Sequence, residues 1–219
     1  MSSNDLNMAQ THVRLLRFFA SKNPFFSLLK VVPLLIVYIA VLLLYFQKIG
    51  WISLSFAAGI ITWSLFEYVV HRWVYHVRIA NKKVRWLIDA FHAHHHHNLT
   101  DYRVLNAGFF IVYPVSAFLL GIVFLITRDF SYTAAFGIGM TCYYVFYEFV
   151  HYYIHFKEWT TGYMQFVQKF HLFHHHHNWY QNFGNTIALW DRIFGTYNPE
   201  YKRYTLDEED RKELIVNNR

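Results

Sequence analysis

Hydrophobic and polar positions alternate along this chain in long blocks. Four apolar stretches, at residues 31–46, 51–70, 104–127 and 130–150, are separated by polar segments that carry nearly all of the charge and histidine. A helix needs about 20 apolar residues to cross a hydrocarbon layer of ~30 Å. The pattern therefore predicts four transmembrane helices. The first reaches full length with the help of Leu28 and Leu29, or where the bilayer is locally thinner.

Short turns at residues 47–50 and 128–129 join the stretches in pairs, which predicts two transmembrane hairpins. The buried helices of a soluble bundle would give a similar pattern, but residues 104–127 contain no charged side chain. Composition points the same way, because 55% of the residues are hydrophobic and only 16% are charged. The expected class is an all-α integral membrane protein.

The distribution of Lys and Arg predicts the orientation in the membrane. Lys48 and Arg128 are the basic residues of the two tight turns, and the others lie in the N-terminus, in residues 72–103 or after His151. The positive-inside rule then places both termini and the middle connection on the cytoplasmic side. The net charge of +6 favours anionic lipid headgroups over nucleic acid as a partner. A bacterial inner membrane and an endoplasmic reticulum membrane would give the same pattern.

We interpret residues 1–219 as a single membrane-embedded domain. It comprises an N-terminal interfacial segment (1–27), four spans within residues 28–150, cap segments at 71–103 and 151–199, and a charged tail (200–219). Residues 66–71 resemble residues 147–151, and residues 91–97 resemble residues 170–176, which indicates an internal repeat of a hairpin followed by histidines. The lone cysteine, Cys142, lies in an apolar stretch, so neither a disulfide framework nor a thiolate cluster is expected.

Histidine is concentrated in four motifs that follow the second and fourth apolar stretches. Positions i, i+3 and i+4 share one face of a helix, so three of the motifs can direct their rings to one side. The first motif has i, i+5 spacing, which puts its rings about 140° apart on a regular helix, from ~100° per residue. It suits either two different metals or a helix that ends between the rings. The motif histidines are His71, His76, His92, His95, His96, His151, His155, His171, His174 and His175.

Ten imidazoles exceed what one ion can accept, so we expect a cytoplasmic cap that holds two metal ions with five nitrogens each. Imidazole binds Fe, Zn, Cu and Ni, so the ligand type leaves the metal open. Carboxylates are too few near the motifs for a carboxylate-bridged centre. Glu67 and Glu148, one helical turn before His71 and His151, are candidates to orient a ring N–H. The roles of four further histidines stay open: His94, His97, His176 and His177.

At these residues the chain resembles the fatty acid hydroxylase and sterol desaturase superfamily, over about residues 51–197. Asp101-x-Arg103 and the segment Gly184-Asn-Thr-x3-Trp190-Asp-x2-Phe194-Gly-Thr are similar to the fatty acid 2-hydroxylase branch. The resemblance implies that the ten motif histidines hold two iron ions, that O2 is a co-substrate and that a lipid C–H bond is hydroxylated. Zinc could occupy isolated protein. Asp101 joins Glu67 and Glu148 as a candidate outer hydrogen-bonding residue.

The chain also departs from that family. Ala93 replaces a common glycine, and residues 97–100 replace a proline-containing continuation, so the substrate lip is expected to differ. The cytochrome b5-type domain of fused members is missing, which implies a separate electron donor of the cytochrome b5 or ferredoxin type. The predicted function is hydroxylation of a lipid acyl chain at a di-iron centre, with C-2 as a candidate position. Alternatives are a sterol or carotenoid hydroxylase or desaturase, a histidine-rich metal transporter or buffer, and an inactive scaffold. The oligomeric state is not indicated.

Overall fold

The computed structural model describes residues 24–46, 48–77, 79–82, 85, 88, 92–97, 99, 109–208, 211 and 214. Every regular element among them is a helix, which confirms the predicted all-helical class. The four long helices are α2 (Pro24–Leu44), α3 (Ile49–Val69), α7 (Phe109–Thr127) and α8 (Phe130–Phe156). The shorter elements are the π-helix η1 (Val70–Tyr75), α5 (His94–His97), α9 (Gly162–His176), α10 (Leu189–Ile193) and the 3-10 helix η3 (Pro199–Arg203).

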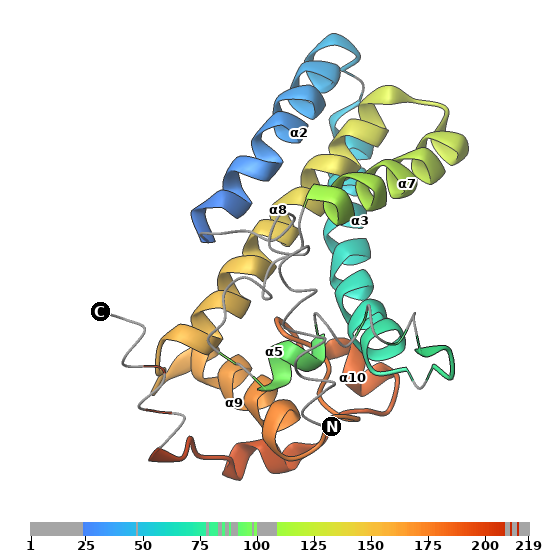
Figure 1. Cartoon of the computed structure of the whole chain (residues 1–219). Coiled ribbons are helices and arrows are strands. Elements are labelled where there is room, and N and C mark those ends of the chain that lie inside the picture. Colours follow the sequence, from blue (N-terminus) through green and yellow to red (C-terminus); the bar gives the residue numbers. More distant parts are fainter. Residues whose placement is uncertain are drawn as a thin grey trace.

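The long helices form two hairpins whose turns lie at the same end of the molecule, and α5, α9 and α10 lie at the other end (Figure 1). The second turn is tight because Arg128 adopts a positive φ of 53° and Asp129 caps the next helix. The Asp129 carboxylate accepts hydrogen bonds from the Ser131 and Tyr132 backbone N–H groups at 2.7 and 3.2 Å. These bonds satisfy N–H groups that have no partner within the helix and so start α8 directly after α7.

Helix α8 is the centre of the bundle and packs against α2, α3 and α7. Its backbone touches that of α3, because a Cβ atom on Gly139 would lie 2.0 Å from the Phe56 carbonyl oxygen. A Cβ atom on Gly59 would likewise lie 2.2 Å from the Phe136 carbonyl oxygen. Small residues at a helix crossing permit this approach, which is typical of helices that pack in a membrane. The crossing fixes the spacing of the two helices that carry His71 and His151.

The boundaries of the helices differ most from the predicted ones at two ends. Helix α2 begins at Pro24, within the predicted interfacial segment, and the preceding residues lie outside the described part of the chain. Helix α8 continues six residues beyond the predicted end of the fourth span, from 150 to Phe156, and so carries His151 and His155 itself. The third histidine motif therefore lies on the end of a long, packed helix.

Among the described residues, one continuous helix, Ile49–Tyr75, is long and apolar enough to cross a membrane. The described apolar parts of the first and third long helices are shorter, at Leu29–Leu44 and Val112–Thr127. Both nevertheless expose large apolar side chains: Leu43 is 74% exposed and Ile126 is 77% exposed. Four helices thus coincide with the four predicted spans, and the crossing of a bilayer by all four stays a prediction.

Candidate metal centre

The histidines of the cap form two groups at the end of α3 and α8. In the first group, the ligand atoms of five histidines lie within 4.8 Å of one another: His71, His76, His92, His96 and His174. In the second group, the same limit holds for four: His95, His151, His155 and His171. His175 adjoins the second group, with its Nε2 2.9 Å from His171 Nε2. The structure therefore brings all ten motif histidines together.

The two groups are not the two halves of the repeat. His92 and His96 enter the first group whereas His95, between them, enters the second. On α9 the arrangement is reversed, because His171 belongs to the second group and His174 to the first. Positions i and i+4 lie on one line of a helix and i+3 lies beside it, so one short helix can serve two neighbouring centres. Each half of the chain thus contributes to both groups.

His71 and His76 reach the same group because the helix between them is a π-helix. Residues Val70–Tyr75 form this turn at the end of α3, and His76 follows it. A π-helix bonds residue i to residue i+5, so positions five apart come to lie on one face. The two ring centroids are 5.2 Å apart. The i, i+5 spacing therefore serves one group, and a regular helix would have separated the rings.

The Nε2 atoms converge in both groups. His76 Nε2 lies 2.7 Å from His92 Nε2 and 3.1 Å from His174 Nε2. His92 Nε2 lies 2.9 Å from His96 Nε2, and His155 Nε2 lies 3.0 Å from His171 Nε2. Neutral nitrogen atoms this close together can all direct their lone pairs at one bound cation. The set is purely imidazole, which suits iron, zinc, copper and nickel.

Burial keeps these imidazoles in the neutral form that binds metals. Desolvation, helped by the neighbouring histidines, lowers the pKa of His76 to about 3 and that of His96 to about 2. The pKa values of His171 and His174 are likewise lowered, mainly by burial. His71 Nε2 is buried with no hydrogen-bond partner among the described residues. The nitrogen atoms are thus desolvated, uncharged and directed at one another, so the residues present fit a pair of metal ions.

Backbone carbonyl groups orient two of the rings from outside. His71 Nδ1 donates to the Phe183 carbonyl oxygen, and His174 Nδ1 donates to the Gln181 carbonyl oxygen at 2.8 Å. A proton on Nδ1 leaves the Nε2 lone pair for a metal, so these bonds select the useful tautomer. The loop at residues 181–186 is therefore part of the site, although it contributes no ligand atom to either group.

Glu67 holds that loop and does not orient His71, so this part of the sequence prediction is wrong. Its carboxylate accepts from the backbone N–H groups of Asn185 and Thr186 at 2.7 and 3.2 Å, and from Thr186 Oγ1 at 2.9 Å. The turn leaves buried N–H groups that need an acceptor, and a buried carboxylate supplies it. The ring N–H of His71 bonds to Phe183 instead.

Asp191 is the second anchor of the loop and was not recognised as such in the sequence. It is fully buried, and its carboxylate accepts from Phe183 N at 2.8 Å, Gly184 N at 2.9 Å and Thr196 Oγ1 at 2.7 Å. Burial raises the pKa of Asp191, and these hydrogen bonds oppose that rise. A Cβ atom on Gly184 would lie 2.1 Å from the Ile187 carbonyl oxygen, so the turn requires glycine. The Gly-Asn-Thr…Trp-Asp segment is thus a loop-building motif.

Glu148 and Asp101 are the other two residues that were predicted to orient a histidine ring. The Glu148 carboxylate accepts from the Tyr144 hydroxyl, and one of its oxygens lies 4.0 Å from Lys30 Nζ. Both Lys30 and Glu148 are buried, so the pair links α2 to α8 one turn before His151. Whether Glu148 also orients a histidine stays a prediction. Asp101 lies outside the described residues.

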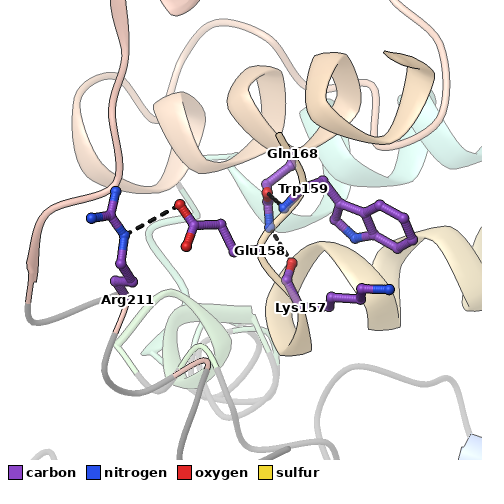
Figure 2. Close-up of polar contacts among 5 residues, drawn as sticks. All are labelled: Lys157, Glu158, Trp159, Gln168 and Arg211. Carbon is purple, nitrogen blue, oxygen red and sulfur yellow. Dashed lines mark hydrogen bonds and ion pairs between the residues drawn. The ribbon is translucent and has the colours of Figure 1, made fainter. Parts of the chain in front are cut away.

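Gln168 is a further residue that sequence reasoning missed (Figure 2). Its Nε2 donates to the Ile154 and Lys157 carbonyl oxygens at 2.7 Å each, and its Oε1 accepts from Trp159 N at 2.9 Å. This amide closes the C-terminal end of α8 and joins it to α9. It thereby sets the position of His155 relative to His171. No local sequence signal marks a glutamine for this role.

Three of the four additional histidines lie outside both groups. His97, His176 and His177 are exposed. His176 Nδ1 is 2.7 Å from the Tyr204 hydroxyl, so it stabilises the join between α9 and the segment after η3. The side chain of His94 is outside the described part of the structure. The geometry thus separates the motif histidines from these three neighbours.

Comparison with known proteins gives a consistent picture. A family model described as fatty acid hydroxylase matches residues 56–196. The chain is 33% identical over 147 residues to a dihydroceramide fatty acyl 2-hydroxylase of Arabidopsis thaliana, covering 63% of this chain and 58% of that protein. It is 29% identical over 150 residues to the human fatty acid 2-hydroxylase, covering 66% of this chain and 40% of that protein.

A solved structure shares the fold. It is described as full-length scs7p with only the hydroxylase domain visible, and it superposes with a TM-score of 0.72 at 24% identity. The match covers 82% of this chain and 68% of that one. The chain spans about three fifths or less of the length of the curated relatives it matches.

Proposed function

The chain belongs to the fatty acid hydroxylase family, and from that premise we propose that it is a membrane-embedded di-iron enzyme that hydroxylates a lipid acyl chain with O2. The observation that carries the proposal is the pair of histidine groups, in which ten imidazoles converge, nine of them buried and that of His76 half-buried. They lie on η1, α5, α8 and α9 and in the segments next to η1 and α5. Two electrons, two protons and one O2 convert a C–H bond to C–OH and release one water. A separate donor protein of the haem or iron–sulfur type supplies the electrons.

The first group and the second group with His175 would each hold one iron ion. When bound, the metal pair supplies the activation of O2 that an unactivated C–H bond requires. The protein holds the ligand nitrogens neutral through burial and fixes ring orientation through Phe183 and Gln181. Aromatic side chains exclude water: Phe183, 2% exposed, packs against His71, His76 and His174.

We propose that α2, α3, α7 and α8 all cross the bilayer, with the histidine cap on the cytoplasmic side. The hairpin turns at one end and the cap at the other support this placement (Figure 1). So does the helix Ile49–Tyr75, which meets the length and hydropathy that a span requires. The exposed apolar side chains of α2 and α7 would otherwise face water. An acyl chain could then reach the centre from within the lipid.

The names of the relatives support a substrate class. Their names describe fatty acid and dihydroceramide fatty acyl 2-hydroxylases, so we propose a lipid acyl chain as substrate and C-2 as the position attacked. Sterol or carotenoid oxidation at the same centre is the alternative, because the histidines do not select the substrate.

A pair of adjacent histidines offers a matched test. We expect His96→Ala to lower the iron content of purified protein from about two ions per chain, because it removes a buried nitrogen of the first group. His97→Ala should retain the wild-type content, because His97 is exposed and outside both groups. Elemental analysis of both variants measures this. Equal iron loss in both variants, or in neither, would contradict the assignment of the ligands.

Lipid mass spectrometry of cells supplied with 18O2 tests the reaction. Cells expressing wild type or His97→Ala should contain acyl chains that have gained one 18O atom, and cells expressing His96→Ala should lack them. Unlabelled acyl chains in cells with verified expression and a reduced donor would overturn the acyl hydroxylase proposal. Label in sterols or carotenoids would instead support the alternative substrates.

A further inference from the structure

Apolar side chains are exposed on one side of the cap, beside the end of α3. On α10, Leu189 is 50% exposed and Ile193 is 59% exposed, and the next residue, Phe194, is 38% exposed. On the π-helix η1, Trp73 is 47% exposed, and its ring lies 5.5 Å from that of Phe194. We call these four residues the α10 surface. In water such a surface would be costly.

The length of the helix Ile49–Tyr75 indicates the depth of this surface. Its 27 residues extend about 40 Å, whereas the hydrocarbon layer is ~30 Å thick and takes up about 20 of them. Counted from Ile49, next to the exposed Lys48, the hydrocarbon ends near Val69. The π-helical turn with Trp73 would therefore lie at the level of the lipid headgroups.

Helix α10 is attached to this part of α3. Trp190 Nε1 donates to Ser64 Oγ at 3.1 Å, and Phe194 stacks on Tyr68 with ring centroids 5.3 Å apart. Ser64 and Tyr68 belong to the last turns of α3, before Val69. Figure 1 shows α10 beside this lower end of the helix. The contacts therefore hold α10 at or just inside the boundary between acyl chains and headgroups.

Two arginines have the position expected of side chains at lipid phosphates. Arg72 donates to the Tyr68 hydroxyl at 2.8 Å and to the Phe194 carbonyl oxygen at 3.3 Å. Its guanidinium also lies 5.0 Å from the centre of the Trp73 ring. Arg192 is exposed and lies between Leu189 and Ile193 in the sequence, and its guanidinium lies 4.1 Å from the centre of the Tyr197 ring. Cations and tryptophan beside apolar side chains are typical of a membrane interface.

We propose that the α10 surface lies in the membrane, at the boundary between headgroups and acyl chains of the cytoplasmic leaflet. The cap is thus partly embedded on the side of α10. From this surface, a chain of aromatic rings leads inward to the first histidine group. Phe194 stacks on Tyr68, the ring centroids of Tyr68 and Phe183 are 6.0 Å apart, and those of Phe183 and His71 are 5.6 Å apart. Lipid contact on this side places acyl chains close to the centre without their passage through water.

This inference rests on the membrane placement of the four long helices proposed above. Nitroxide labels can test the position of the α10 surface and the placement of the helices independently. In a Cys142→Ser background reconstituted into phosphatidylcholine and phosphatidylglycerol nanodiscs, single cysteines would replace Ile193, Leu189, Leu54 and Lys202. Leu54 is an exposed residue within α3, and Lys202 is an exposed residue of η3. Collisions with O2, which dissolves in hydrocarbon, and with a water-soluble nickel chelate report the depth of each label. Unchanged metal content would verify that each labelled variant is folded.

We expect the ratio of O2 to nickel accessibility at positions 193 and 189 to be several-fold higher than at 202 and to approach that at 54. A ratio at 193 and 189 equal to that at 202, with a high ratio at 54, would overturn the proposal for α10 and leave the membrane placement intact. A low ratio at 54 as well would overturn the membrane placement and this inference with it.

Discussion

One amide side chain joins the two helices of the second histidine group. Gln168 is 2% exposed and makes three hydrogen bonds to the backbone around the end of α8. Figure 2 shows those to Lys157 and Trp159. The Ile154 and Lys157 carbonyl groups lie at a helix end, where carbonyl oxygens have no partner within the helix. A buried polar group that loses its partner costs the full desolvation penalty, about 1–3 kcal/mol.

We therefore expect Gln168→Leu to lower the free energy of unfolding by at least ~1–3 kcal/mol and to weaken metal binding, because His155 and His171 would lose their fixed spacing. Thermal unfolding and iron content measure the two effects. Arg211→Gln is the matched control, since the Arg211–Glu158 ion pair in the same region is 3.2 Å long but 45% and 34% exposed. An exposed pair contributes only about 0–1 kcal/mol. Equal effects of both substitutions would contradict the role assigned to Gln168.

At the scale of residues, the sequence predicted which histidines come together better than it predicted the hydrogen-bond partners of the surrounding residues. The motif histidines could be predicted because i, i+3 and i+4 spacing is a local property of a helix. The partners of Glu67 could not, because they lie 118 and 119 residues away, at Asn185 and Thr186. Nothing in the local pattern indicates which distant loop a buried carboxylate will hold. The same holds for Asp191, whose neighbours in sequence do not reveal a turn that needs an acceptor.

At the scale of the elements, the long helices could be predicted from the apolar stretches of the sequence, but their irregular ends could not. A π-helical turn from Val70 to Tyr75 converts the i, i+5 spacing of His71 and His76 into a shared face. Sequence reasoning that assumed 3.6 residues per turn left two interpretations open. The turn packs against the segment around Phe194 and Thr196, which Arg72 of the turn and Tyr68 before it contact.

The crossing of α3 and α8 offers a test at this scale. We expect Gly139→Val to separate the two helices, because any Cβ atom there would meet the Phe56 carbonyl oxygen at 2.0 Å, and backbone cannot give way as a side chain can. The separation should move His71 away from His151 and abolish binding of the full metal complement. Iron content and thermal unfolding of the purified variant check this.

Gly121→Ala in α7 is the control for that substitution, since a Cβ atom there would meet nothing within 4 Å outside the backbone of its own helix and its chain neighbours. It should retain the metal and leave stability unchanged or raise it by up to ~1 kcal/mol, the difference in helix propensity. Metal binding that survives Gly139→Val would show that the crossing does not set the spacing of the histidine groups.

At the scale of the whole molecule, the sequence indicated a repeat but not how its halves combine. His95 and His174 each join the group that is built mainly by the other half. Local spacing cannot reveal this exchange, because it depends on how α5 and α9 lie against each other. The consequence is that a metal ion in either group would connect segments that are up to about a hundred residues apart along the chain.

Metal removal should therefore loosen the cap far more than the helix bundle. Helix α5 has four residues, His94–His97, too few for a helix to persist by itself, and His92, His95 and His96 point into the two groups. The crossing of α3 and α8 is held by contacts that involve no histidine, such as those at Gly59 and Gly139. A ligand that binds the folded state at 100 times its Kd adds about 2.7 kcal/mol to stability, and its loss removes that contribution.

We expect chelation of reduced protein in detergent to lower its Tm and to raise amide hydrogen exchange most strongly in residues 92–97. Exchange in the central turns of α3 and α8 should change little. The same comparison on His97→Ala should give the same pattern, since its metal groups are intact, whereas His96→Ala should already exchange rapidly before chelation. A uniform rise in exchange across cap and bundle would show instead that the metals stabilise the entire fold, and that the helix crossing depends on them.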